Sequence, residues 1–233
     1  MIAEILCTVE DFRKRIQAMT DEKLLRYGTP PNTCPCDFCY KISSTMYADP
    51  TFDLTFPHSY SVVPTELSPN GEPPPIYFPG GTRTGGNDGM LLRFTPSNGD
   101  QWRGCFAFGD YDLCGVFAMP NPDHVCVVSK GTGYWVHVNE PEKSSKMRAL
   151  PVWDVRIVSD ARIILLADFT ALSAVGPDGQ VWKHRVCWDG LKILEVQNGI
   201  VTGTGYDPTN SVHSKSEFAV ELATGRILQS PCS

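Results

Sequence analysis

The sequence contains no apolar run near the length of about 20 residues that a membrane-spanning helix needs. Its first residues, MIAEILCTVEDFRKR, place Glu4 inside a short apolar start and offer no small-residue cleavage site. We therefore expect no signal peptide, no membrane partner and, by default, a cytoplasmic location.

Basic residues are in the minority. Lysine and arginine number 20 against 26 aspartates and glutamates, which gives a formal net charge of −6. Such a balance argues against an extended basic surface for a phosphate backbone, so nucleic acid is not an expected partner. The densest basic stretch, Lys143–Arg148, is expected to be a solvated loop.

Familiar catalytic motifs are also missing. The chain has no G-x-S-x-G elbow, no H-E-x-x-H pair and no phosphate loop ending in G-K-[S/T]. The glycine-rich stretch Gly80–Gly89 has Arg83 as its only cation, which is weak support for nucleotide binding. No catalytic residue is predicted, and the balance favours a protein that is not an enzyme.

Strand-sized apolar runs separated by turn dipeptides dominate the last third of the chain. Ile163–Ala167 is continuously apolar, and Asp189-Gly190 and Asn198-Gly199 suit hairpin corners with positive φ. The flanking residues are β-branched or aromatic, which is typical of strands. The pattern predicts an antiparallel meander of consecutive hairpins.

The whole chain, residues 1–233, is expected to form one mainly β domain. Phe12, Ile16 and Met19 recur at helical spacing, so residues 1–30 are expected to be a small helical N-terminus. Residues 31–89 are rich in proline and glycine and are expected to be mostly loop, with extended pieces at 60–63 and 76–78. Residues 90–233 form the expected β-sheet core, either sandwich-like or partly propeller-like.

Residues 110–228 contain the pieces PNPDHVCVVSKGTGYWVHVNEP, LLADFTALSAVGPDGQVWKHRVCWDGLKILEV, GTGYDP and FAVELATGRI. In these pieces the region resembles a group of uncharacterised bacterial β-rich proteins. The resemblance implies no activity and no catalytic residues. It carries a loose association with toxin–immunity loci.

Cys34, Cys36 and Cys39 form the sharpest local cluster. Cys36 and Cys39 have the C-x-x-C spacing of zinc ligands, and thiolates bind zinc well. No second close pair completes the set, although Cys7 or His58 could supply a fourth ligand. Zinc binding at the three thiols therefore stands beside a simpler reading, in which they are reduced cysteines in a loop. Cys105, Cys114, Cys126 and Cys187 lie in apolar runs and are expected to be reduced and buried.

Three other features have weaker chemical content. His184 shares a predicted strand face with Trp182 and Trp188, and we expect it to be packed rather than catalytic. Asp110 and Asp112 could hold a cation or act as an acid–base pair, but a turn cap is the simpler role. The tryptophans are expected to be mostly core, with a minority forming a protein-binding face.

Two functional hypotheses follow. The first is a non-enzymatic cytoplasmic protein that binds another protein, and an immunity protein that neutralises a bacterial toxin is its specific version. An acidic chain would attract a basic toxin electrostatically. The second is a metal-binding protein or enzyme that uses Cys34, Cys36 and Cys39.

Overall fold

A computed structural model describes residues 50–66, 73–84, 86–97, 99–147, 151–208 and 215–230. The chain divides into two units, residues 1–49 and 50–233, and every described residue belongs to the second. The predicted helical segment at 1–30 therefore lies outside the described residues. Within the described ranges the helical element is one short 3-10 turn, Pro141–Lys143, and no helix has the length and apolarity to cross a membrane.

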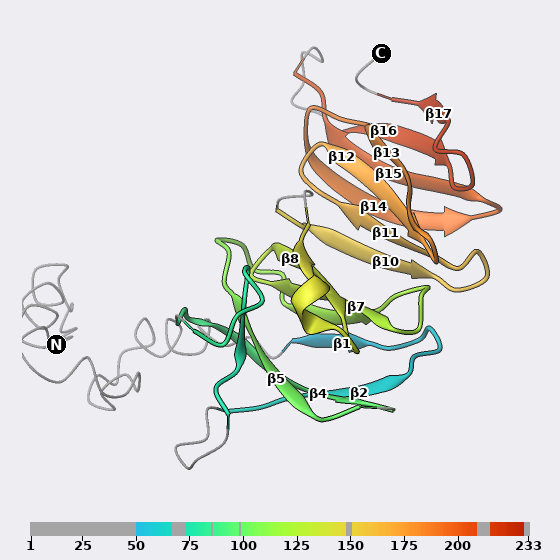
Figure 1. Cartoon of the computed structure of the whole chain (residues 1–233). Helices are drawn as coiled ribbons and strands as arrows, with labels where there is room; N and C mark the ends of the chain where they lie inside the picture. Colours follow the sequence, from blue (N-terminus) through green and yellow to red (C-terminus); the bar gives the residue numbers. More distant parts are fainter. Residues whose placement is uncertain are drawn as a thin grey trace, which may run out of the picture. The chain divides into compact units, whose positions relative to one another are not determined.

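The described residues of the second unit form four sheets, and the protein is mainly β (Figure 1). The first sheet has the order β2 (Tyr60–Pro64), β4 (Gly89–Pro96), β5 (Trp102–Ala107) and β3 (Ile76–Phe78). The second has the order β1 (Thr51–Asp53), β6 (Gly115–Ala118), β7 (His124–Ser129), β8 (Thr132–His137) and β9 (Ser145–Lys146). The third runs β10 (Asp154–Val158), β11 (Ile163–Ala167), β12 (Ala171–Gly176) and β13 (Gly179–Arg185). The fourth runs β14 (Asp189–Gln197), β15 (Ile200–Tyr206), β16 (Lys215–Glu221) and β17 (Ile227–Gln229).

The third and fourth sheets are the predicted meanders of consecutive antiparallel hairpins. Gly179, Gly190, Asn198 and Gly199 have positive φ, as their turn dipeptides require. The extended pieces predicted at 60–63 and 76–78 are confirmed as β2 and β3.

Antiparallel pairing is not universal. Strand β1 pairs parallel with β6, and β3 pairs parallel with β5. Both β1 and β3 come from the proline-rich part of the chain, where long connections separate them from their partners. A parallel pair needs such a long crossover, so the turn motifs of hairpins do not predict parallel pairing.

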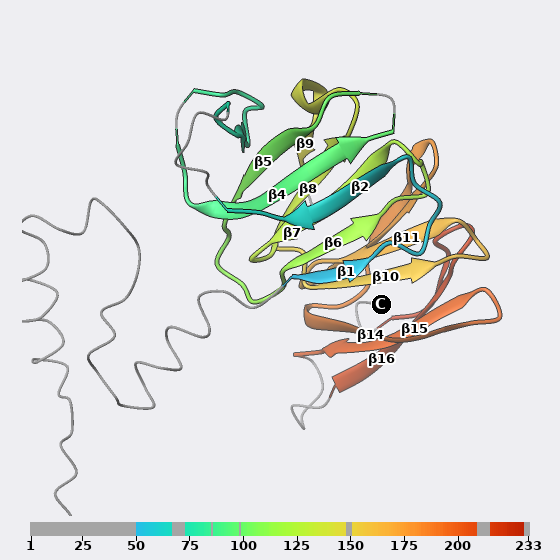
Figure 2. The same ribbon diagram turned by 90° about the horizontal axis from the view of Figure 1, so that it is seen from below.

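Three hydrophobic cores lie between successive sheets, so the sheets pack in chain order. The first core joins the first and second sheets, and it includes Phe106 and Val127. A second joins the second and third sheets through residues such as Cys126 and Ile164, and a third joins the third and fourth through Leu165 and Phe218. Figure 2 shows the same sheets from a perpendicular direction.

This arrangement explains why some strands are continuously apolar. In β11, Ile163 and Leu165 face the fourth sheet, whereas Ile164 and Leu166 face the second. All five residues of the strand are buried. A strand covered on both faces loses the alternation of a half-buried strand, which β15 of the fourth sheet retains.

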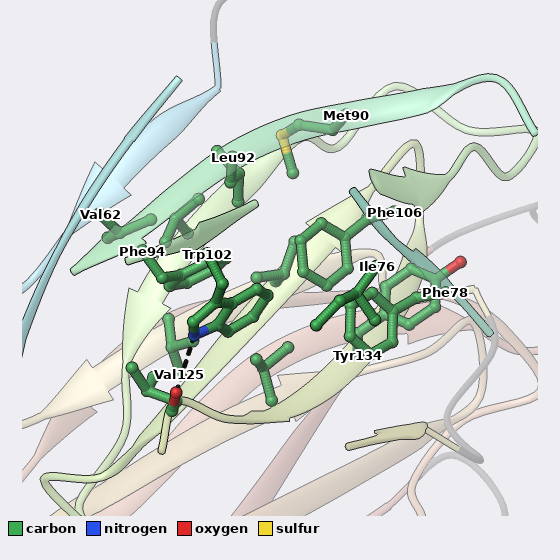
Figure 3. Packing of buried hydrophobic residues seen from close by; sticks show 14 of the residues in the cluster. Val62, Ile76, Phe78, Met90, Leu92, Phe94, Trp102, Phe106, Val125 and Tyr134 are labelled. Atoms are coloured by element: carbon green, nitrogen blue, oxygen red, sulfur yellow. Dashed lines mark hydrogen bonds between the residues drawn. The ribbon is translucent and has the colours of Figure 1, made fainter. Parts of the chain in front are cut away.

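The first core is rich in aromatic rings (Figure 3). Phe78 stacks on Phe106 with ring centroids 4.8 Å apart, and Phe94 stacks on Trp102 at 4.3 Å. The indole Nε1 of Trp102 donates a hydrogen bond of 2.9 Å to the carbonyl of Val138 in the second sheet. Burying each such ring contributes about 1.5–3 kcal/mol, so this core ties the two sheets together firmly.

Candidate protein-binding surface

The predicted zinc ligands Cys34, Cys36 and Cys39 lie outside the described residues. Within the described ranges, no group of three or more histidine, cysteine, aspartate or glutamate side chains could hold a metal ion. The described part of the chain therefore offers no alternative metal centre.

The four described cysteines are free thiols. Cys105, Cys126 and Cys187 are buried, as predicted, but Cys114 is only partly buried. Burial raises the pKa of Cys105 to about 11 and that of Cys126 to about 12. Both thiols are therefore protonated at neutral pH, where the reactive form is the thiolate, so they behave as small apolar side chains.

His184 has the packed role that its strand position predicted. Its ring stacks on Trp182 with centroids 5.9 Å apart, and Trp182 donates from Nε1 to the carbonyl of Leu222 at 2.7 Å. Trp188 does not share this face, because it lies beyond the end of β13 and is 42% exposed.

Asp110 and Asp112 lie in the loop between β5 and β6, not on a strand. Asp112 is exposed, and Asp110 lines a small hollow beside Lys130 and Lys146. Neither carboxylate belongs to a metal-binding group within the described ranges.

The tryptophans divide between the interior and the surface. Trp102 and Trp182 are buried and their indole groups are hydrogen-bonded, Trp135 is partly buried, and Trp153 and Trp188 are exposed. Trp153 directly precedes β10 and is 45% exposed. A large exposed indole is a feature of interfaces, because its burial by a partner removes much apolar area from water.

Trp153 belongs to a cluster of three rings, which we call the aromatic cluster. Its ring centroid lies 5.0 Å from that of Phe169 and 6.3 Å from that of Tyr111, and the Tyr111 and Phe169 centroids are 5.1 Å apart. Tyr111 and Phe169 are both partly exposed. The rings pack edge-to-face or tilted, geometries that stabilise aromatic pairs beyond their buried area.

The three rings come from three connections among the first three sheets. Tyr111 lies between β5 and β6, Trp153 directly precedes β10, and Phe169 lies between β11 and β12. The backbone N–H of Trp153 donates to the carbonyl of Ala167 at 2.7 Å, which extends the β10–β11 pairing up to the cluster. The aromatic cluster therefore lies directly beside the ends of strands.

Asp168 holds the Phe169 turn. Its Oδ1 accepts hydrogen bonds from the backbone N–H groups of Thr170 at 2.9 Å and Ala171 at 2.7 Å. Its Oδ2 lies 3.3 Å from the ammonium of Lys183. Aspartate commonly fixes turns in this way, so the Phe169 ring is presented on a restrained loop.

The Trp188 loop lies next to the Phe169 turn. The backbone N–H of Leu191 donates to the carbonyl of Phe169 at 3.1 Å, and Cys187 Sγ approaches the same oxygen at 3.4 Å. The guanidinium of Arg185 lies 4.3 Å from the ring centroid of Trp188, a cation–π distance. Trp188 therefore adds an exposed aromatic ring at the connection between the third and fourth sheets.

A hollow of about 240 Å³ borders the cluster at Tyr111. Its lining includes the carboxylate residue Asp110 and the ammonium residues Lys130 and Lys146. Lys130 also lies 5.2 Å from the ring centroid of Phe108. Polar groups of both signs beside exposed rings resemble the polar rim around the apolar centre of a protein interface.

The sequence predicted a minority of surface tryptophans but did not identify them. The sequence placed Trp188 on a strand face with His184, whereas the structure puts Trp153 and Trp188 just outside β10 and β13. Tyr111 and Phe169 gave no signal in the sequence, because their proximity depends on sheet packing. No family model and no curated protein matches this chain.

Proposed function

We propose that this protein is a non-enzymatic, cytoplasmic protein-binding module, and that it contacts its partner through the aromatic cluster of Tyr111, Trp153 and Phe169. The observation that carries the proposal is the exposure of Trp153 on a restrained framework of neighbouring rings. Restrained aromatic anchors provide apolar contact area with little loss of side-chain entropy on binding.

The charge of the chain favours a basic partner. A formal net charge of −6 attracts a positively charged protein over distances of about a Debye length and speeds its association. The lysines in the hollow beside Tyr111 would then form ion pairs with carboxylates of the partner at short range. The specific version of the proposal is an immunity protein whose partner is a basic toxin encoded by a neighbouring gene.

The test begins with the full chain immobilised and exposed to extract of its native host. Any stoichiometric partner is identified by mass spectrometry, purified, and mixed with the protein for light scattering and calorimetry. We expect a 1:1 complex. The Trp153→Ala and Phe169→Ala variants should each weaken it about tenfold or more, as expected of interface anchors.

Leu228→Ala is the matched control, because Leu228 lies on β17 of the fourth sheet and is 47% exposed, close to the value for Trp153. This variant should bind with unchanged affinity. Absence of a stoichiometric partner would contradict the proposal, as would equal affinity of the wild type, Trp153→Ala and Phe169→Ala.

The immunity version has its own readout. Expression of the partner alone should arrest growth of a heterologous host, and co-expression of the wild type should restore it. Trp153→Ala should restore growth poorly, whereas Leu228→Ala should restore it fully. A partner that is harmless when expressed alone would reject the immunity version and leave the binding proposal to the affinity measurements.

A further inference from the structure

A second candidate site lies at the end of the first sheet where β3 and β5 begin, and two of its arginines are on the face opposite the aromatic core. It is independent of the proposed protein-binding surface. Alternation along β4 places Leu92 and Phe94 in the core and Arg93 on the other face. The same alternation separates Arg103 of β5 from its core neighbours Trp102 and Phe106. Figure 2 shows β4 and β5 side by side in this sheet.

Three arginines from three segments meet at one pocket of about 200 Å³ at this end of the sheet. Arg93 and Arg103 are directly opposite each other in the antiparallel β4–β5 pairing. Arg83 comes from the connection after β3. The other lining residues are Pro73, Gln101 and Trp102.

Each of the three guanidinium groups donates a hydrogen bond to a neutral oxygen atom. Arg83 Nη1 donates to the carbonyl of Pro74 at 2.6 Å, and Arg93 Nη2 donates to Thr65 Oγ1 at 3.0 Å. Arg103 Nη2 donates to the carbonyl of Pro73 at 2.7 Å, which anchors the segment that borders the pocket. Arg83 and Arg93 form no ion pair with another described residue.

The described lining of the pocket therefore carries positively charged side chains within an acidic protein. Its described lining contains no aspartate or glutamate. A guanidinium carries five N–H donors, so Arg83 and Arg93 retain donors beyond the bonds just given. Two such groups form strong, directional hydrogen bonds with a phosphate or carboxylate.

A larger hollow of about 390 Å³ adjoins the pocket, because Arg83, Gln101 and Trp102 line both. Its chemistry is different. Ile76, Val138 and Pro141 contribute apolar surface, and Asp100 and Asn139 contribute polar groups. The Asp100 carboxylate accepts hydrogen bonds from hydroxyl groups, and the Asn139 amide both accepts and donates them. The carboxylate also repels a second anion.

We propose that this composite site binds a small phosphomonoester with a hydroxyl-bearing body, such as a sugar phosphate. The phosphate lies in the smaller pocket between Arg83 and Arg93, and the body lies in the larger hollow near Asp100. The two compartments account for both halves of the ligand, since one is cationic and the other is partly apolar and hydroxyl-binding.

Calorimetry on the full chain tests the assignment with glucose 6-phosphate, glucose and inorganic phosphate as probes. We expect saturable binding of glucose 6-phosphate, weaker binding of inorganic phosphate and none of glucose. Arg83→Gln and Arg93→Gln should each weaken the phosphate ester about tenfold or more, because each removes charge-assisted hydrogen bonds. Thermal unfolding of each variant confirms that it is folded.

Arg226→Gln is the control, because it removes the same charge from an exposed ion pair with Glu221 on the fourth sheet. Its affinity should match the wild type. The assignment is overturned if glucose 6-phosphate does not saturate the protein at about 10 mM, a concentration about ten times a weak Kd of about 1 mM. Equal losses in Arg226→Gln and Arg93→Gln would also overturn it, because binding would then follow total charge. Equal affinities for inorganic phosphate and glucose 6-phosphate would contradict the proposal that the larger hollow binds the body of the ligand.

Discussion

At the scale of single residues, one titratable pair stands apart from both candidate sites. His124 of β7 and His137 of β8 are directly opposite, and His124 Nε2 lies 2.9 Å from His137 Nδ1. One ring nitrogen must donate and the other accept, so the contact requires at least one neutral imidazole. Burial lowers the pKa of His124, and the neighbouring His137 lowers it further, against a smaller opposing effect of Asp123.

Because the pKa of His124 is lowered on folding, the stability of the protein depends on pH in a definite direction. The pKa of His124 lies below its unfolded value of 6.5, so the unfolded chain binds more protons between the two values. The contribution of this residue to stability is therefore complete above pH 6.5 and is lost as the pH falls toward the folded pKa.

We accordingly expect His124→Gln to reduce the difference in unfolding free energy between pH 7.5 and pH 5.5. Urea titrations followed by tryptophan fluorescence at both pH values give that difference. Leu194→Ala serves as the control, because Leu194 is 57% exposed and carries no ionisable group, and it should keep the wild-type pH dependence. An identical loss of stability in the wild type and His124→Gln would contradict this reading.

Single residues also show where sequence reasoning reaches its limit. The packed role of His184 followed from its position on a strand with Trp182. The pocket of Arg83, Arg93 and Arg103 did not follow, because the β4–β5 register and the connection after β3 bring the three together. Arg83 alone was visible as the only cation of a glycine-rich stretch.

At the scale of elements, burial on one or both faces separates the strands into two kinds. Leu165 of β11 is fully buried between the third and fourth sheets, whereas Leu194 of β14 is 57% exposed. Both are leucines in antiparallel strands, so they make a matched pair. Deleting buried leucine atoms costs transfer free energy and leaves a cavity.

Leu165→Ala should lower the free energy of unfolding by about 2–5 kcal/mol. Leu194→Ala should change it by no more than about 0.5 kcal/mol, as is usual for exposed positions. Chemical denaturation of the two variants measures both values. Similar losses in the two would show that the third and fourth sheets are not packed as described.

The elements were the most predictable level of this protein. Hairpin signals such as Asn198-Gly199 located the meanders, and the continuous apolar run 163–167 predicted a strand. That this strand is buried on both faces became clear only from the packing of the sheets. The parallel pairs of β1 and β3 escaped prediction, because their partners β6 and β5 are distant in sequence. The same distance hid the meeting of Tyr111 with Phe169.

At the scale of the whole described unit, the serial packing of sheets has a functional consequence. Inner strands are covered by neighbouring sheets, whereas the rings of Trp153 and Phe169 lie at connections outside the strands. Packed sheets hold these connections in place, and Asp168 restrains one of them directly. The account therefore locates partner binding at sheet ends.

Hydrogen–deuterium exchange of the full chain, alone and with its purified partner, tests that central claim most directly. Peptides covering Tyr111, Trp153 and Phe169 should exchange more slowly in the complex, because their backbone amides become shielded from water. Peptides covering the arginine pocket of the first sheet, around Arg93, should be unchanged. Protection confined to the first sheet, with none at the aromatic cluster, would contradict the account.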